Sequence, residues 1–297
     1  MSELNLKHLR AARRARQAGL NVLPGVVGTG LGVKRRAGER VASSSLIVFV
    51  DQKLPLGELR PSARIPKFVS VGGRRVPTDV VQINAVRPEF GGAPYFMSDS
   101  VERGVVAAFG EADGKFFLVT CAHCLVGADK NPFSVSPVGI WAGQDKGYVL
   151  VGESVYAVNS PGFGRAGDFG FMDAGFAHLR HPEMIKRARA ARAMPIALNI
   201  HRGHAVAAEG PNGPMFGEID GVEIEVFGQR TDVLVHVGGN GTYPGYSGMM
   251  WRTQNGSCVA MHSFGAQFTP SSGSRYSLAI AAKRVSETLQ VTLLQPV

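Results

Sequence analysis

The most informative part of the chain reads Gly241-Thr242-Tyr243-Pro244-Gly245-Tyr246-Ser247-Gly248-Met249-Met250. Its serine, Ser247, stands between Gly245 and Gly248, and glycine lets the backbone adopt angles that other residues resist. The N–H groups of Ser247 and of Gly245, two residues earlier, can converge on one point and hold an oxyanion. A glycine-rich turn between two strands would have the same composition, so this stretch by itself leaves both interpretations open.

A histidine and an aspartate earlier in the chain favour the catalytic interpretation. His123 comes just after the apolar run Phe117-Leu118-Val119, and Asp173 lies between it and Ser247. Histidine, then aspartate, then serine is one of the orders in which Ser-His-Asp triads occur along a chain. A serine hydroxyl is a weak nucleophile until a base takes its proton. We therefore expect Ser247 to be the nucleophile, His123 its base, and Asp173 the residue that fixes the histidine tautomer.

Four segments resemble a known family. Thr120-Cys121-Ala122-His123-Cys124 is similar to the Thr-Ala-Ala-His-Cys of trypsin-like serine proteases, and Asp173 opens a segment similar to their Asp-Ile-Ala-Leu. Gly245-Tyr246-Ser247-Gly248 resembles their Gly-Asp-Ser-Gly, and His262-Ser263-Phe264-Gly265 resembles their Val-Ser-Trp-Gly. The segments keep the family's order. The resemblance implies a mainly β, chymotrypsin-like fold of two six-stranded antiparallel β-barrels, and a serine endopeptidase that forms an acyl-enzyme.

The resemblance also assigns roles to the residues around the triad. It implies an oxyanion hole made by the backbone N–H groups of Gly245 and Ser247. It implies that Ser263, Phe264 and Gly265 bind the substrate backbone. Gly241 stands near the position where trypsin keeps an aspartate for basic side chains, so we expect a small or apolar residue before the cut.

Three residues depart from the family pattern, because Tyr246 replaces its aspartate and Met249-Met250 replaces its Gly-Pro. Tyr246 replaces the acidic residue that pairs with a newly cut N-terminus in zymogen-activated members, so we expect no such activation. Instead, Tyr246 should hold the turn by packing or hydrogen-bonding locally. Met249 replaces a glycine beside the nucleophile, where it either narrows the cleft or packs inward.

Other arrangements of chemically active residues were weighed against the triad. Asp168 is an alternative to Asp173 as the third member. Cys121-x-x-Cys124 has the spacing of half a zinc site or of a redox pair, but only Cys258 offers a further thiol. We expect three reduced thiols, no metal and no cofactor.

The rest of the chain divides into two regions. Residues 1–90 should form a helix and a small β-rich extension, with strands at Val26–Val33, Ser45–Val50 and Val76–Ile83. This extension resembles one found in some intracellular bacterial trypsin-like proteins. Residues 91–297 should form the protease domain, with the first barrel at about 91–180 and the second at about 195–290, because short strands separated by turns suit a barrel. Helices are expected at Pro182–Met194 and Ala282–Leu294.

Composition sets limits on partners and location. The net charge of +9 is concentrated in three basic clusters, but neither interleaved aromatic residues nor a known nucleic-acid motif accompanies them, so we expect solvated faces rather than a nucleic-acid site. No run approaches the roughly 20 apolar residues of a membrane span. The start of the chain shows no signal-peptide pattern, and the odd number of cysteines argues against a disulfide framework. We expect a cytoplasmic protein; its oligomeric state stays open.

Two functions therefore remain. One is an active serine endopeptidase acting on protein or peptide substrates. The alternative is a catalytically weak trypsin-like pseudoprotease that binds peptides by strand addition beside Ser263-Phe264-Gly265.

Overall fold

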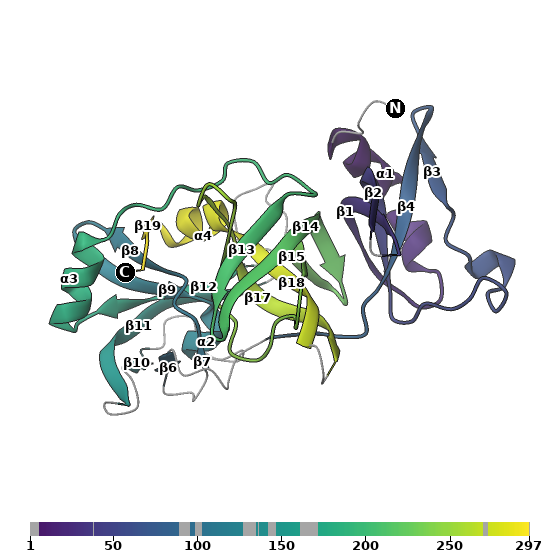
Figure 1. Cartoon of the computed structure of the whole chain (residues 1–297). Helices are drawn as coiled ribbons and strands as arrows, with labels where there is room; N and C mark the ends of the chain where they lie inside the picture. Colours follow the sequence, from purple (N-terminus) through teal and green to yellow (C-terminus); the bar gives the residue numbers. More distant parts are fainter. Residues whose placement is uncertain are drawn as a thin grey trace.

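The structure is a computed structural model, and it describes residues 6–37, 39–88, 96–98, 103–126, 135, 137–141, 147–160, 172–269 and 273–296. Two large β-sheets make up most of this part of the chain, and helices are short and few (Figure 1). The mainly β fold class predicted from the strand spacing is confirmed. No helix in the described ranges is long and apolar enough to cross a membrane.

Six antiparallel strands close into a barrel in the C-terminal half of the chain. Around the ring they are β13 (Ala205–Gly210), β16 (Met250–Arg252), β17 (Cys258–Thr269), β18 (Gly273–Ala281), β15 (Gln229–Val237) and β14 (Gly213–Val226). The ring closes because β14 also pairs with β13. In β14, Val222, Ile224 and Val226 are buried while Glu223 and Glu225 are partly exposed, as expected of a strand with one wet face.

The second sheet has eight strands rather than the expected six. Its order is β19 (Thr292–Leu294), β8 (Ala108–Ala112), β9 (Lys115–Thr120), β12 (Met172–Leu179), β11 (Tyr148–Ser160), β10 (Pro137–Trp141), β6 (Phe96–Ser98) and β7 (Arg103–Gly104). Neighbouring strands are antiparallel. Within the described residues its two end strands do not pair, so closure is seen for the C-terminal barrel only.

The C-terminal tail corrects one prediction. The helix expected over Ala282–Leu294 ends early: α4 spans Ala282–Leu289. Gln290 then adopts a left-handed backbone with φ +55°, which turns the chain out of the helix. The following residues form β19 and pair with β8, so the end of the chain joins the sheet that carries His123.

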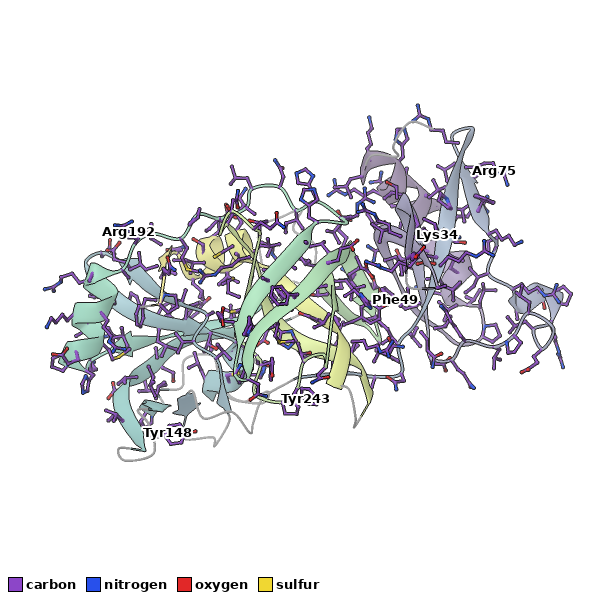
Figure 2. All side chains as sticks on the ribbon, in the orientation of Figure 1. Lys34, Phe49, Arg75, Tyr148, Arg192 and Tyr243 are labelled. Atoms are coloured by element: carbon purple, nitrogen blue, oxygen red, sulfur yellow. The ribbon has the colours of Figure 1, made fainter. Side chains whose placement is uncertain are left out.

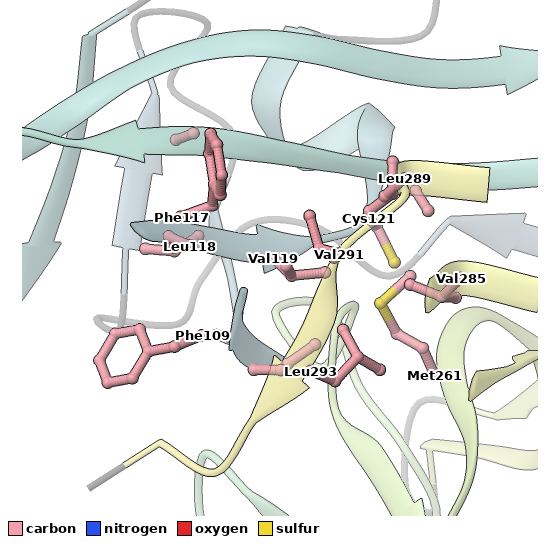
Figure 3. Packing of buried hydrophobic residues seen from close by; sticks show 14 of the residues in the cluster. Phe109, Phe117, Leu118, Val119, Cys121, Met261, Val285, Leu289, Val291 and Leu293 are labelled. Carbon is pink, nitrogen blue, oxygen red and sulfur yellow. The ribbon is translucent and has the colours of Figure 1, made fainter. Parts of the chain in front are cut away.

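A hydrophobic core packs between the two sheets. Figure 3 shows Val119 of β9 beside Val291, with Leu118, Leu293, Met261 of β17 and Val285 of α4 in the same core. All six are buried. Because side chains from both sheets fill this core, it fixes the ends of β9 and β17 relative to each other, and both strands lead into the candidate site.

The N-terminal region builds onto the barrel. Its strands β1 (Val26–Arg36), β2 (Glu39–Val50), β3 (Phe68–Val71) and β4 (Arg74–Gln82) form one sheet, which continues into the barrel because β1 pairs with β14. A short 3₁₀ helix, η1 (Pro61–Ala63), precedes β3. Lys34 and Phe49 lie in this region in Figure 2, well away from Tyr243 in the barrel. The boundary near residue 90 stays a prediction.

The first helix, α1 (Leu6–Asn21), covers one face of this sheet. Leu9, Ala12 and Leu20 are buried against it. The helix continues past Gly19 to Asn21. Arg13, from the first basic cluster, is buried: its Nη1 donates to Glu223 O at 2.6 Å, and its Nη2 lies 3.3 Å from Glu225 Oε2. This part of the basic charge therefore docks the helix onto β14.

Two further helices lie in the part of the chain that follows residue 103. Helix α2 (Ala122–Val126) follows β9 directly. Helix α3 (Pro182–Ala190) begins with proline at its first position and ends before the predicted Met194, because Ala191 is already extended.

Candidate active site

The ends of two paired strands place His123 and Asp173 side by side. His123 stands in the first turn of α2, three residues after the end of β9, and Asp173 is the second residue of β12. These strands pair antiparallel, with Thr120 opposite Gly175. Both side chains are almost completely buried. Residues 50 apart in the sequence are thus held together by the sheet itself.

A continuous hydrogen-bond chain joins the three predicted triad residues. His123 Nδ1 lies 2.6 Å from Asp173 Oδ2, and the His123 backbone N–H donates to Asp173 Oδ1 at 3.0 Å. His123 Nε2 lies 2.9 Å from Ser247 Oγ, across the space between the two sheets. The arrangement therefore has the distances of a nucleophile, a base and an orienting carboxylate. Asp168 lies outside the described residues.

Ser263 on β17 contacts two members of this chain. Its Oγ donates a very short hydrogen bond to Asp173 Oδ2, and its carbonyl accepts a hydrogen bond from Ser247 Oγ at 3.1 Å. The sequence had indicated Ser263 only as a substrate-binding residue. Its contact with Asp173 spans 90 positions, so sequence spacing gives no signal for it. Phe264, the next residue, lies with its ring 5.9 Å from the His123 ring.

The nucleophile loop is held by backbone contacts on both sides. Ser247 O accepts a hydrogen bond from Val105 N–H at 2.7 Å, and Gly248 N–H donates to His262 O at 2.9 Å. Gly245 has φ +100° and Gly248 has φ +97°, angles that residues with a Cβ rarely adopt. The two glycines of the motif are therefore needed for the shape of the loop.

Tyr246 and Met249 both point into the barrel. The Tyr246 hydroxyl accepts from Asn212 Nδ2 at 3.1 Å, and its backbone N–H donates to Tyr243 O at 3.1 Å. These contacts are the local support expected of a tyrosine at this position. Met249 is fully buried within the hydrophobic cluster of the barrel, so of the two alternatives left open it packs inward.

Gly248 gives a stability prediction for the loop. A Cβ at this position would lie 2.1 Å from Val105 O and 2.5 Å from Thr120 Oγ1. Gly248→Ala should therefore lower the free energy of unfolding by about 3 kcal/mol, because a clash with backbone adds to the strain of the positive φ. Gly239→Ala is the matched control: its φ is +64° and nothing lies within 4 Å of the added Cβ. Urea unfolding of both variants measures the difference, and equal losses would contradict the clash.

Electrostatics favours a charged Asp173 next to a readily protonated His123. Burial of the imidazole acts to lower the pKa of His123, but the charges of Asp173 and Cys124 and the hydrogen bonds with both outweigh it, and the net pKa lies well above the usual value. Burial likewise acts to raise the pKa of Asp173, but the His123 charge and the hydrogen bonds from His123 and Ser263 bring it below its usual range. The pair therefore stabilises the imidazolium that forms when the base takes a proton.

The cysteines beside His123 are free thiols, as is Cys258. Cys121 Sγ donates to His262 O at 3.1 Å, and Figure 3 shows its side chain among the core residues. Burial raises the pKa of Cys121 well above the usual value. Burial acts in the same direction on Cys124, but hydrogen bonds from Cys121 and His123 and the His123 charge lower its pKa to about 7.

Ligand atoms of Cys121, His123 and Asp173 lie within 4.8 Å of one another, close enough for one metal ion. The set fits a metal poorly. A metal-binding cysteine must lose its proton, and burial opposes that in Cys121. His123 and Asp173 already bind each other in this group.

Gly241 lies in the turn after β15, next to a cavity of about 290 Å³. The cavity is lined by uncharged residues, among them Asn212, Phe216 and Tyr243. Tyr246 lines it but Ser247 does not, so the structure does not connect this cavity to the nucleophile. The expected preference for a small or apolar residue before the cut stays a prediction.

Comparison with known proteins finds similar solved structures but no match by sequence. No protein-family model matches the chain, and no curated protein matches it by sequence. Among solved structures, a chymotrypsin from Cellulomonas bogoriensis is 13% identical, with 68% of this chain and 96% of that chain covered and a TM-score of 0.43. Protease A from Thermobifida fusca is 15% identical, with 70% and 99% covered and a TM-score of 0.43.

A third similar structure is the thermostable serine protease AL20 from an extremophilic microorganism. It is 18% identical, with 66% of this chain and 95% of that chain covered and a TM-score of 0.42. Identity is low in all three cases. In its structure, the chain is similar to serine proteases of the chymotrypsin type.

Proposed function

We propose that the protein is a serine endopeptidase whose catalytic residues are Ser247, His123 and Asp173. The observation that carries this proposal is the 2.9 Å contact between His123 Nε2 and Ser247 Oγ, in a histidine whose other ring nitrogen lies 2.6 Å from Asp173. A histidine held at both nitrogens in this way can take the hydroxyl proton without reorienting.

The proposed reaction has two halves. Ser247 Oγ attacks the carbonyl carbon of a peptide bond while His123 Nε2 takes its proton. The imidazolium gives that proton to the leaving amine, and the acyl chain stays on Ser247. Water then attacks the ester with His123 again as base, which releases the acid and frees the serine. Asp173 stays ionised throughout and stabilises the imidazolium.

The oxyanion of each tetrahedral intermediate would accept hydrogen bonds from the N–H groups of Gly245 and Ser247. Support for this comes from the fixed loop: Ser247 and Gly248 are tied on opposite sides by Val105 and His262, so the loop is shaped before substrate arrives. Tyr246 supplies local support in place of an ion pair to a cut N-terminus. We therefore propose an enzyme whose nucleophile loop needs no proteolytic activation.

A second candidate function rests on the burial of the nucleophile. Ser247 has 0% of its surface exposed, and its hydroxyl also bonds to Ser263 O. A protein that binds peptides along β17 without cleaving them would have no need of an exposed serine. The two candidates differ in one property, the reactivity of Ser247.

A fluorophosphonate probe tests that reactivity directly. Such probes form a bond only with an activated serine, so the wild-type protein should be labelled and Ser247→Ala should not be. Ser257→Ala is the control, because Ser257 lies in a turn between β16 and β17 away from the site, and its labelling should match the wild type. Peptide mapping should place the adduct on Ser247. Absent labelling of folded wild-type protein would favour the peptide-binding candidate.

A further inference from the structure

A short strand from the linker between the N-terminal region and the protease-like part lies against β17. Strand β5 (Val86–Pro88) pairs antiparallel with it, with Val86 opposite Ala266, Arg87 opposite Gly265 and Pro88 opposite Phe264. One residue earlier, Ala85 O accepts a hydrogen bond from Gln267 N–H at 3.3 Å. The linker is therefore part of the barrel's hydrogen-bonding pattern.

The edge that β5 occupies is one that no barrel strand uses. On one side β17 pairs with β18 along most of its length. On the other side β16 pairs only with the stretch Cys258–Met261. Among the described residues, the stretch Phe264–Ala266 pairs on that side with β5 and with no barrel strand, and such an edge is a template for an extended chain.

This edge lies next to the nucleophile. Its neighbour along β17 is Ser263, whose carbonyl accepts the hydrogen bond from Ser247 Oγ. Since β5 and β17 are antiparallel, the chain direction of β5 runs from Gln267 toward Ser263. A peptide bound on this edge in the same direction would reach Ser247 with its C-terminal part.

We infer that β5 is a resident occupant of the peptide-binding edge, and that a substrate peptide must displace it in order to pair with Phe264–Ala266. This inference rests on the proposed function in one respect: it takes the substrate to be an extended peptide. A tethered competitor acts at a high effective concentration, on the order of millimolar for a short linker, so even a three-residue strand can compete.

The register supplies a way to lock β5 in place. Hydrogen-bonded and non-hydrogen-bonded pairs alternate along antiparallel strands. The bond between Gln267 and Ala85 marks a hydrogen-bonded pair, so Val86 and Ala266 form a non-hydrogen-bonded pair with their side chains close together. The double variant Val86→Cys with Ala266→Cys should form a disulfide that holds the strand on the edge.

The first experiment compares this double variant before and after reduction. The two thiols lose two electrons and two protons to oxidised glutathione, which is reduced to two glutathione molecules. Fluorescein-labelled unfolded casein is the binding probe, used in the Ser247→Ala background so that cleavage plays no part. The oxidised protein, with its bond verified by mass, should bind casein at least tenfold more weakly than the reduced protein. The Ser247→Ala protein without the two added cysteines, treated with the same oxidant, controls for the native cysteines.

The second experiment weakens β5 instead of locking it. Arg87 faces Gly265 at the next hydrogen-bonded position, and proline has no N–H to donate there. Arg87→Pro should bind casein about tenfold more tightly than Arg87→Ala, which keeps the N–H and loses the same side chain; a tenfold change corresponds to about 1.4 kcal/mol. Both variants carry Ser247→Ala and should melt at similar temperatures.

The results distinguish the inference about β5 from the proposal that the protein is a protease. If casein binding is the same with β5 locked, free or weakened, β5 is no competitor and the inference is wrong, whatever Ser247 does. If casein binding changes as expected but the fluorophosphonate probe leaves wild-type Ser247 unlabelled, the edge is regulated as inferred and the protease proposal fails. Probe labelling should itself be equal in Arg87→Pro and Arg87→Ala with Ser247 intact, since a small probe does not reach Gly265.

Discussion

His123→Ala is expected to lower the rate of peptide hydrolysis by about 10⁶-fold. His123 is the residue that contacts both other members of the hydrogen-bond chain, at 2.6 Å to Asp173 and 2.9 Å to Ser247. Without the imidazole, the Ser247 hydroxyl has no base to take its proton, and Asp173 is left as a buried charge. Single-turnover hydrolysis of a fluorogenic peptide measures the loss, because it isolates the acylation step.

A matched control lies on the same sheet. His178 belongs to β12, as Asp173 does, but its ring packs against Phe117 at 5.5 Å, away from Ser247. His178→Ala should therefore keep the wild-type rate. If His123→Ala retained more than about a hundredth of the activity, His123 would not be the base, since proton transfer alone contributes 10²–10⁴-fold.

The sequence named the three residues of the candidate triad but not the backbone segments around them. Ser247 could be named because glycines flank it, His123 because it follows an apolar run, and all three because their order matches a known triad order. Strand ends have recognisable residue types, and side chains at strand ends meet when the strands pair. The structure adds the distances between them, 2.6 Å from His123 to Asp173 and 2.9 Å from His123 to Ser247.

Contacts between distant backbone segments could not be predicted in this way. The pairing of β5 with β17 depends on Arg87 lying opposite Gly265, and nothing in the stretch around Pro88 resembles a strand; its proline indicated a boundary instead. The pairing of β1 with β14, which makes the N-terminal region continuous with the barrel, could not be predicted for the same reason. The pairing register of segments almost 200 residues apart is set by the whole fold, so local sequence patterns do not predict it.

One wrong prediction and one open alternative have local causes. The sequence predicts a single helix over Ala282–Leu294, but the left-handed Gln290 ends α4, and three of the following residues form β19. Glutamine gives no signal for such an angle, which glycine or asparagine normally marks. Met249 left two possibilities open, because a sequence shows the size of a side chain and not the side to which it points.

The final prediction concerns Asp173 and the dependence of activity on pH. Asp173→Asn should lower kcat by about 10⁴-fold, the loss in the Ser-His-Asp template, because an amide N–H facing Nδ1 holds the histidine in the wrong tautomer. Activity requires neutral His123, which exists above its pKa. Since Asp173 holds that pKa well above its usual value of 6.5, wild-type activity should fall as the pH drops, with a midpoint above 6.5.

Removal of the carboxylate should move that midpoint to lower pH. In Asp173→Asn the burial of the imidazole remains, and burial acts to lower the pKa of His123. The rate of probe labelling measured between about pH 5 and pH 9 gives both midpoints, because labelling needs the same neutral base. Asp113→Asn is the control: Asp113 lies in the exposed turn between β8 and β9 with φ +50°, an angle that asparagine accepts. A midpoint that stayed unchanged in Asp173→Asn would mean that another group sets the pKa of His123, and the assignment of Asp173 as its partner would have to be given up.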